Sequence, residues 1–271
     1  PPETCHICYC STPIRYAWDF YYEYFGKNGH TGWLTRKTAP FVINYLKMWD
    51  VLSLNRVDYF IANSLNVARK IEKYYHRDAS IIYSPVDTEY FRPSEKTEDY
   101  FLIVSRLVNY KRTDLAIKAF NQLKIPLIIV GEGPDGKRLK KMANSNIKFL
   151  GWQSDEKLRE LYSGCKAFIF PQEEDFGITP LEAQACGRPV IAFGKGGALE
   201  TVEDGVSGIF FDRPDPDSLI EAVKRFNPEK FKPDIIRKHV LGFDNQVFKT
   251  KIEDFVMEKY EEYQKKIQIA D

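Results

Sequence analysis

Short apolar runs separated by amphipathic segments fill the chain from Tyr100 onward. Six of these runs predict strands: YFLIVS, PLIIVG, IKFLG, KAFIFP, RPVIAF and SGIFF. The intervening segments RTDLAIKAFNQL, DGKRLKKMAN, SDEKLRELYSG, TPLEAQACG and PDSLIEAVKRF have helical periodicity. Short, wholly apolar strands that alternate with helices are typical of a parallel sheet with both faces covered. The pattern predicts an α/β protein whose residues 93–240 form a complete Rossmann-like domain.

Residues 1–92 have a different pattern, rich in aromatic side chains. Helices are predicted around the short strands CHICYC, DYFIAN and ASIIYS, with Ser64 placed to cap the helix after the second strand. A charged linker that contains prolines follows the third strand and predicts a domain boundary near residue 92.

The last 31 residues, 241–271, predict mainly one long amphipathic helix. Its apolar positions Phe248, Ile252, Phe255 and Val256 share one face at helical spacing. The helix is longer than the second domain needs, and we expect it to pack back against the first domain.

Composition limits the kinds of partner. With 271 residues, 44% of them hydrophobic, the chain can bury two cores. Thirty-nine basic and 38 acidic residues leave no broad positive field, so we expect no nucleic acid partner and only local recognition of anions.

No apolar run approaches the roughly 20 residues of a membrane span, and no charged-then-apolar leader precedes Pro1. We therefore expect a cytoplasmic protein. The segment FYYEYFGKNGHTGWLTRKTAPFVINYLKMW mixes aromatic and basic residues. Such a composition occurs in helices at lipid headgroup surfaces and in packed helices alike, so peripheral membrane association stays open.

Cysteines and a glycine-rich turn offer two alternative chemistries. Cys5, Cys8 and Cys10 are close together, but no second group of Cys or His at ligand spacing accompanies them, and we expect reduced thiols and no metal. GEGPDG, at residues 131–136, fits the dinucleotide pattern G-x-G-x-x-G. It follows the second strand of its domain, contains a proline and has no acidic residue after the next strand, so a tight strand-to-helix turn is the better interpretation.

Loops that follow the strands carry the candidate anion site. SRLVNYKR places Arg106, Lys111 and Arg112 after the first strand of the second domain, and a guanidinium with an ammonium suits a diphosphate. After the strand KAFIFP, Thr179 is expected as an N-cap and Pro180 as the first helical residue. The free N–H groups of that helix would then face the same edge of the sheet.

Two glutamates flank this helix start. Glu182 lies three residues after Thr179, which is also the capping-box spacing, so it is either a cap or a ligand-binding carboxylate. Glu174 lies in an acidic loop, either as a solvated charge or as an acceptor for ligand hydroxyl groups.

Five motifs in order, SRLVNYK, GEGP, GWQSDEKLRELYSGCKAFIFP, the E-x7-E pair and GKGGALETVEDGVSGIFF, resemble the family 4 glycosyltransferases of GT-B fold. CYCSTPIRYAWDFYYEYF and DYFIANSLNVARKIEKYYHRDASIIYSPVDTEYF are similar to the branch of GDP-mannose-dependent mannosyltransferases in O-antigen and polysaccharide synthesis. The resemblance implies a complete C-terminal donor domain, and only part of an N-terminal acceptor domain whose first half is missing.

The resemblance also implies a function: metal-independent, retaining transfer of a hexose from a nucleotide-sugar donor to a glycan or lipid-linked acceptor. Arg106 and Lys111 would hold the diphosphate, Glu182 the ribose and Glu174 the donor sugar. The backbone N–H groups of Phe176, Gly177, Ile178 and Thr179 would line the sugar and phosphate, and Trp152 would contact the base.

One position departs from the family pattern. Ser11 stands where this branch commonly has histidine facing the donor sugar, and serine cannot carry a positive charge. A non-catalytic nucleotide-sugar-binding protein or partner subunit is therefore the alternative function.

Overall fold

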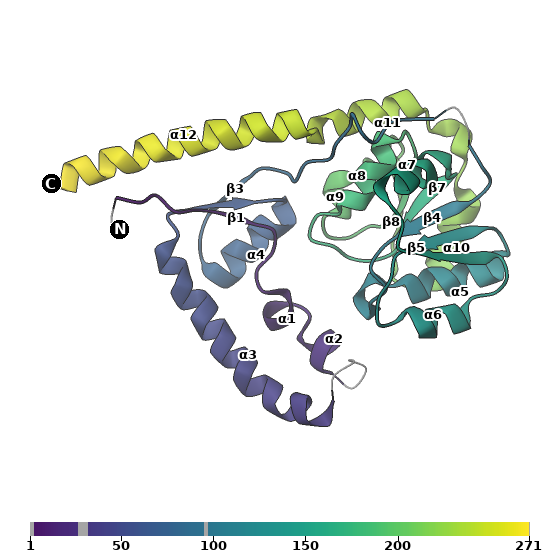
Figure 1. The fold of residues 1–271 in the computed structure, drawn as a ribbon, viewed down its shortest axis with the longest axis horizontal. Helices are drawn as coiled ribbons and strands as arrows, with labels where there is room; N and C mark the ends of the chain where they lie inside the picture. The colour runs from purple at the N-terminus through teal and green to yellow at the C-terminus, as the bar shows by residue number, and fades with distance from the viewer. Residues whose placement is uncertain (1–2, 27–31, 95–96, 271) are drawn as a thin grey trace. The chain divides into compact units, whose positions relative to one another are not determined.

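The structure, a computed structural model, describes residues 3–26, 32–94 and 97–270 of the chain (Figure 1). It divides into two compact units, Pro1–Ser84 with Phe248–Asp271, and Pro85–Val247. The sequence predicts boundaries some eight residues from these, at 92/93 and 240/241. The difference arises because Val86 and Thr88 already bond to the second unit: Val86 N donates to Phe243 O at 2.9 Å, and Thr88 Oγ1 to Asp244 Oδ2 at 2.6 Å.

The first unit contains a three-stranded parallel sheet in the order β1-β2-β3. Ser64 caps α4 as the sequence predicts, since its Oγ accepts from Val67 N at 3.0 Å. The α-helices and strands of this unit in its first 84 residues are β1 (Ile7–Cys10), α1 (Arg15–Trp18), α2 (Tyr21–Phe25), α3 (Trp33–Ser53), β2 (Tyr59–Ala62), α4 (Leu65–Tyr75) and β3 (Ala79–Ile81), with a 3-10 helix at Leu54–Arg56.

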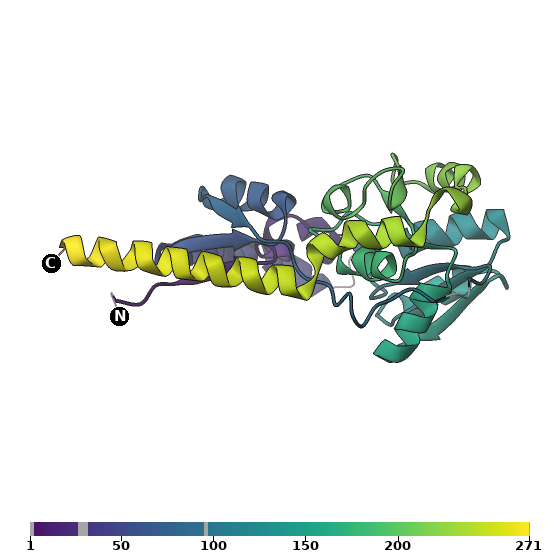
Figure 2. The ribbon, with the colours of Figure 1, turned by 90° about the horizontal axis from the view of Figure 1, so that it is seen from above.

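The long helix α12 (Asn245–Ala270) is continuous, as Figure 2 shows in yellow. Most of its length belongs to the first unit, where the ring of Phe248 meets that of Tyr9 edge-on at 5.7 Å. Phe248, Ile252 and Phe255 are partly buried, whereas Val256 is exposed. The apolar face of α12 that packs is therefore narrower than the sequence predicts, because Val256 points away from it.

The second unit is the predicted Rossmann-like domain. All six strands are parallel, in the order β6-β5-β4-β7-β8-β9. The strands are β4 (Phe101–Val104), β5 (Leu127–Val130), β6 (Ile147–Gly151), β7 (Ala167–Phe170), β8 (Val190–Phe193) and β9 (Gly208–Phe211). The order reverses between β4 and β7, which are neighbours in the sheet, and the crevice beyond the carboxyl ends of such a pair is where ligands bind in open α/β sheets.

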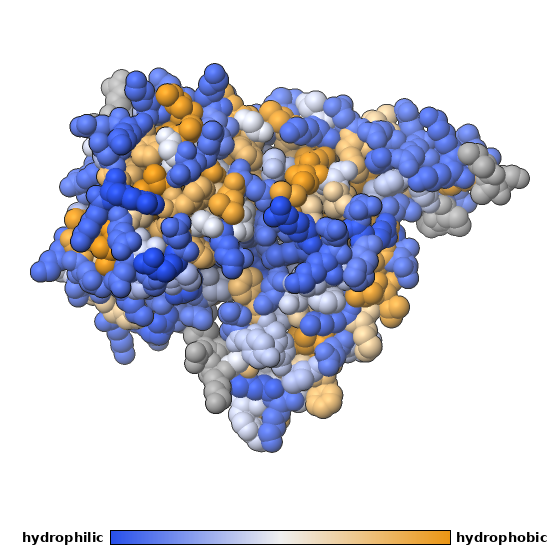
Figure 3. All heavy atoms as spheres, turned by 180° about the vertical axis from the view of Figure 1, so that it is seen from behind, coloured by the Kyte–Doolittle hydropathy of each residue, from blue (hydrophilic) through white to orange (hydrophobic). Residues whose placement is uncertain are grey.

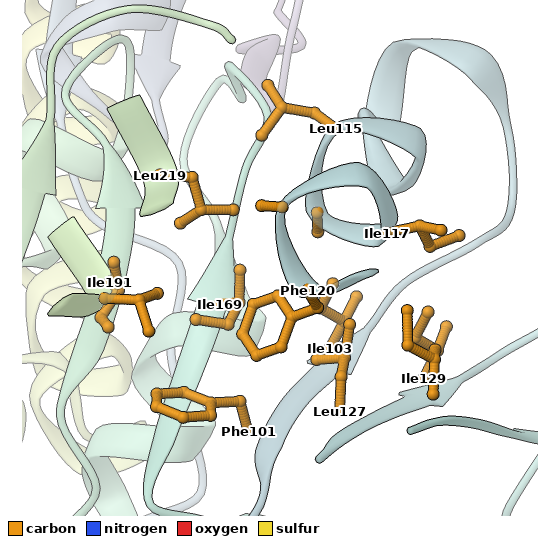
Figure 4. Close-up of a cluster of buried hydrophobic side chains, with 14 of the residues drawn as sticks. Phe101, Ile103, Leu115, Ile117, Phe120, Leu127, Ile129, Ile169, Ile191 and Leu219 are labelled. Atoms are coloured by element: carbon orange, nitrogen blue, oxygen red, sulfur yellow. The ribbon is translucent and has the colours of Figure 1, made fainter. Parts of the chain in front are cut away.

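Helices cover both faces of this sheet (Figure 1). One face carries α5 (Thr113–Leu123), α6 (Gly136–Met142) and α10 (Pro216–Arg225); the other carries α7 (Asp155–Gly164), α8 (Ile178–Ala185), α9 (Ala198–Thr201) and α11 (Pro233–Val240). The pattern did not predict α9 or α11. Figure 4 shows Phe120 of α5 packed with Phe101 and Ile169 of the sheet, in a core that fixes where the strand ends lie.

Candidate functional site

A pocket of about 560 Å³ lies in the second unit at the carboxyl ends of β4, β5 and β7. Its volume is within the range of small-molecule and cofactor sites. The site residues Arg106, Lys111, Trp152 and Thr179 come together in its wall. The full lining is Val104, Ser105, Arg106, Lys111, Val130, Gly131, Glu132, Trp152, Gln153, Asp155, Leu158, Gln172 and Thr179.

The loop that carries Arg106 and Lys111 is held by its backbone. Leu107 is buried and its N–H donates to Glu132 O at 2.9 Å, which ties this loop to the GEGPDG turn. Gly131 has φ +117°, and a Cβ there would lie 2.0 Å from Ser105 O. The glycines of GEGPDG therefore allow two loop backbones to pack together, which confirms their interpretation as a tight turn.

The two cations of the loop that line the pocket differ in their surroundings. Arg106 is exposed and forms no salt bridge within the described part of the chain. The ammonium group of Lys111 forms an ion pair with Glu174, and the two side chains are only 20% and 9% exposed. The pocket thus presents one free guanidinium and one cation that is already partly neutralised.

Backbone contacts also hold the loop of Glu174 after β7. Gly197 N donates to Glu174 O at 2.8 Å, and a Cβ on Gly197 would lie 2.3 Å from Phe176 Cα. Gly196 has φ +62°, and a Cβ there would lie 2.4 Å from Glu174 O. The GKGG turn after β8 is therefore the support on which Glu174 and Phe176 are positioned.

The helix after this loop starts earlier than the sequence predicts. Its N-cap is Gly177, with φ +97°, and Ile178 is the first helical residue, so Thr179 is not the cap and Pro180 is the third residue rather than the first. Gly177 tolerates the positive φ that the entry into α8 requires. The first N–H groups of α8 have no intrahelical partner by geometry, and Thr179 places this end of α8 at the pocket.

Glu182 makes no capping box. Its Oε2 accepts a 2.6 Å hydrogen bond from the hydroxyl of Tyr162, a fully buried residue on α7. Burial raises the pKa of Glu182, and the hydrogen bond from Tyr162 opposes that rise. Sequence spacing could not reveal this partner, because Tyr162 lies 20 residues away on another helix.

The raised pKa of Glu182 leads to a pH-dependent stability. Above the ordinary glutamate pKa of about 4.3, the unfolded chain releases the proton sooner than the folded chain, so stability falls as pH rises from there through the folded pKa. Glu182→Gln removes this titration while keeping an oxygen acceptor for Tyr162. As pH increases from 4 toward neutrality, we expect the melting temperature of the variant to rise relative to that of the wild type. A difference in melting temperature that does not change with pH would contradict this expectation.

Trp152 is 74% exposed at the pocket wall, which offers a free aromatic face beside Gln153 and Asp155. Ser11 follows β1 and belongs to the first unit, whereas all residues that line this pocket belong to the second unit. Phe176, Gly177 and Ile178 lie in the loop and first turn before Thr179 and do not themselves line the pocket, and neither do Glu174 and Glu182.

Gln172 is a pocket residue that sequence reasoning missed. It is 2% exposed, and its Oε1 has no hydrogen-bond partner although it lies in the lining. A buried, unsatisfied oxygen costs free energy that a ligand hydroxyl or N–H group could recover. Nothing in its sequence context distinguishes Gln172 from the neighbouring polar residues.

Replacing Gln172 with methionine tests this position. The variant keeps the side-chain volume and removes the unsatisfied oxygen, so the unliganded protein should be as stable as the wild type or more so. Affinity for a ligand that bonds to this oxygen should fall about 5- to 10-fold, the value of one hydrogen bond. Calorimetric titration with nucleotide sugars, the ligands that the sequence resemblance implies, measures the affinity, and thermal unfolding without ligand measures the stability. Unchanged affinity would contradict a ligand contact.

No group of three or more His, Cys, Asp or Glu side chains within the described residues is arranged to hold a metal ion, and none of the five cysteines forms a disulfide bond. No helix among the described residues is both long enough and apolar enough to cross a bilayer.

Residues 87–238, more than half of the chain, match the family model described as glycosyl transferases group 1. The chain therefore belongs to this family. Its fold, with parallel α/β sheets, is that of the GT-B glycosyltransferases, as the sequence predicts.

Among curated relatives, a D-inositol 3-phosphate glycosyltransferase of Mycobacterium avium is 29% identical over 196 residues, which cover 63% of this chain and 46% of that protein. An uncharacterised glycosyltransferase of Methanocaldococcus jannaschii is 29% identical over 174 residues, 61% of this chain and 48% of that protein. The chain thus spans about half the length of these relatives.

Solved structures give the same fold at lower identity. HepE of Anabaena, in complex with UDP and glucose, has a TM-score of 0.70 and 22% identity, and the match covers 78% of this chain and 66% of HepE. Sucrose-phosphate synthase of Thermosynechococcus elongatus has a TM-score of 0.72 and 19% identity, with 80% and 62% covered.

Proposed function

We propose that this protein is a hexosyltransferase that takes a sugar from a nucleoside diphosphate donor and retains its anomeric configuration. The observation that carries the proposal is the pocket at the β4/β7 reversal, where Arg106, Lys111 and the start of α8 meet. These are three sources of positive potential in one small volume, and each would attract a diphosphate.

The residues that would bind the diphosphate contribute most to the proposed catalysis. In the transfer, the bond between C1 of the sugar and the diphosphate oxygen breaks, a bond from the acceptor hydroxyl oxygen to C1 forms, and the hydroxyl proton passes to an oxygen of the departing diphosphate. Negative charge develops on the departing phosphate, so Arg106 and Lys111 would stabilise the transition state more than the ground state. The step uses no metal in this proposal.

The remaining residues would hold the other parts of the donor. Glu174 would accept sugar hydroxyls in exchange for part of its contact with Lys111, and the backbone around Phe176, Gly177 and Ile178 would line the sugar. Trp152 would stack on the base. Glu182 keeps Oε1 free of hydrogen bonds from the described residues and would accept a ribose hydroxyl there while Oε2 stays bound to Tyr162.

For the donor we propose GDP-mannose first, on the resemblance of residues 1–92 to mannosyltransferases of polysaccharide synthesis. UDP-glucose is the second choice, since HepE was solved with UDP and glucose. A glycan or lipid-linked hydroxyl compound is the proposed acceptor class.

Thermal unfolding with a panel of GDP and UDP sugars tests the proposal. GDP-mannose should raise the melting temperature most, since a ligand that binds only the folded state adds RT ln(1 + [L]/Kd) to stability. Slow release of the nucleoside diphosphate should accompany binding, and the product's anomeric proton in NMR should match the donor's configuration. Binding without release would favour a non-catalytic protein, and no stabilisation by any nucleotide or nucleotide sugar would refute the site.

A further inference from the structure

An aromatic ring supports the loop of Glu174 in addition to the glycine turn. Phe176, in this loop, is 3% exposed and does not line the pocket. Its backbone lies against Gly197, whereas its ring lies against the ring of Phe243, with 6.0 Å between the ring centroids and 51° between the ring planes. Phe243 ends a 3-10 helix, Leu241–Phe243, that follows α11. Aromatic pairs contribute beyond the area that they bury, so Phe243 is a second support for the loop.

The ring of Phe243 also contacts a histidine that reaches back toward the glycine turn. The ring centroid of His239, on α11, lies 5.9 Å from that of Phe243. His239 Nδ1 lies 3.2 Å from Glu203 Oε2, and its Nε2 lies 3.4 Å from Thr201 O at the end of α9. The helix α9 begins directly after Gly197. The contacts thus lead from the loop through two rings back to the turn that holds the loop's backbone, and this packing restrains the ring of Phe243.

The main chain of Phe243 is fixed by the segment through which the chain enters the second unit. Phe243 O accepts a 2.9 Å hydrogen bond from Val86 N. The guanidinium of Arg237, on α11, donates to Thr88 O in this segment at 2.7 Å and to Ala185 O, at the last residue of α8, at 2.8 Å. The helix α8 is therefore held at its end by this arginine and ahead of its start by the contact between the two phenylalanine rings.

No neighbour in the chain can replace the ring of Phe243. It is the last aromatic residue of the second unit, which ends at Val247. The chain then continues in α12, whose far end carries mainly hydrophilic side chains (Figure 3, upper right). Leu241, in the same 3-10 helix, is 45% exposed. Removal of the Phe243 ring should therefore leave Phe176 without its aromatic partner.

We propose that Phe243 is a positioning residue for the donor site. It does not line the pocket, and it acts through Phe176, whose position in the chain sets that of Glu174. Glu174 would bind hydroxyl groups of the donor sugar, so the contact between the rings sets where the sugar lies relative to the diphosphate. This inference rests on the proposed function and adds to it a residue outside the pocket.

Steady-state kinetics of Phe243→Ala with the accepted donor test the proposal. The turnover number kcat should fall about 10- to 100-fold, since a small displacement of a group that positions the substrate has an effect of this size. KM for the donor should change less than threefold, because Arg106 and Lys111 lie on a separate loop and the glycine turn still guides the backbone. Phe243→Leu, which keeps a large apolar side chain against Phe176, should restore kcat to within about threefold of the wild type.

Phe226→Ala is the matched control. Phe226 directly follows α10, is also partly buried, and stacks on Phe231 with 5.4 Å between the ring centroids. Both alanine variants remove one ring of an aromatic pair, so both should lower the melting temperature. Only Phe243→Ala should lower kcat, and Phe226→Ala should stay within twofold of the wild type. A folded Phe243→Ala variant that keeps half or more of the wild-type kcat overturns the proposal, and so does an equal loss of kcat in both variants.

Hydrogen–deuterium exchange without ligand separates this proposal from the proposed function. In Phe243→Ala, the amides of residues 174–178 should exchange about 2- to 10-fold faster than in the wild type, the contribution of one aromatic pair, and in Phe226→Ala they should not. If the wild type binds no nucleotide sugar, the proposed function fails, while faster exchange in this segment still supports Phe243 as the residue that holds the loop. Unchanged exchange there in a folded Phe243→Ala variant overturns that role.

Discussion

Replacing Lys111 with alanine should lower kcat/KM for the accepted donor about a thousandfold, the upper part of the range for loss of one group that stabilises developing charge. Two effects combine here. The variant removes one of the two cations that line the pocket, and it removes the ion pair that Lys111 forms with the Glu174 carboxylate, which is only 9% exposed. Steady-state kinetics on purified, folded protein measure the loss.

Lys118→Ala is the matched control for this experiment. Lys118 is an exposed lysine of α5 outside the pocket, and its removal should change kcat/KM less than twofold. Lys111→Arg, which keeps the charge but not its shape, should recover part of the activity. A Lys111→Ala variant that retains a third or more of wild-type kcat/KM would show that the diphosphate binds elsewhere.

Gly197→Ala should abolish donor-induced stabilisation although Gly197 touches no ligand in the proposed complex. The backbone of Gly197 has φ −64°, which any residue adopts, so the cost is steric. The added methyl group would lie 2.3 to 2.6 Å from the Cα, O and N atoms of Phe176 and would push the loop of Glu174 from its position. Overpacking of this kind also lowers the free energy of unfolding by about 1–3 kcal/mol.

Denaturant unfolding gives the stability loss, and calorimetry with the best donor gives the affinity. Gly242→Ala is the control, since a Cβ at Gly242 would meet no atom within 4 Å. We expect wild-type affinity and stability from it. If Gly197→Ala bound the donor as tightly as the wild type, the position of the Glu174 loop would not matter for binding.

The strands and their parallel arrangement could be predicted because each strand is a short, wholly apolar run between segments of helical periodicity. Strands that are buried on both faces of a sheet have this pattern. The turn around Gly131 was predictable for a related reason, since closely packed backbones exclude side chains. The start of α8 was not: a Thr-Pro pair is a strong local signal for a cap, but Gly177 takes the positive φ that the preceding loop demands.

Partners that are distant in sequence escaped prediction. The hydrogen bond from Tyr162 to Glu182 joins two helices, and the same glutamate satisfies a local capping rule that the fold does not use. Gln172 is notable only because its oxygen is buried without a partner, a property that exists only once the strands are assembled. Val256 fits an apolar helical face by its spacing in the sequence, but the side of α12 that packs is too narrow to include it.

Main-chain atoms hold the Glu174 loop in position, so the path of its backbone and the side chains that it presents can vary independently. Gly196 and Gly197 contact the backbone of Glu174 and Phe176, so these contacts do not depend on the identity of the side chains at positions 173 and 174. Asp175 is only 5% exposed and is best kept. A library randomised at positions 173 and 174, with Asp175 and both glycines kept, is the natural starting point for changing which donor sugar the proposed transferase accepts.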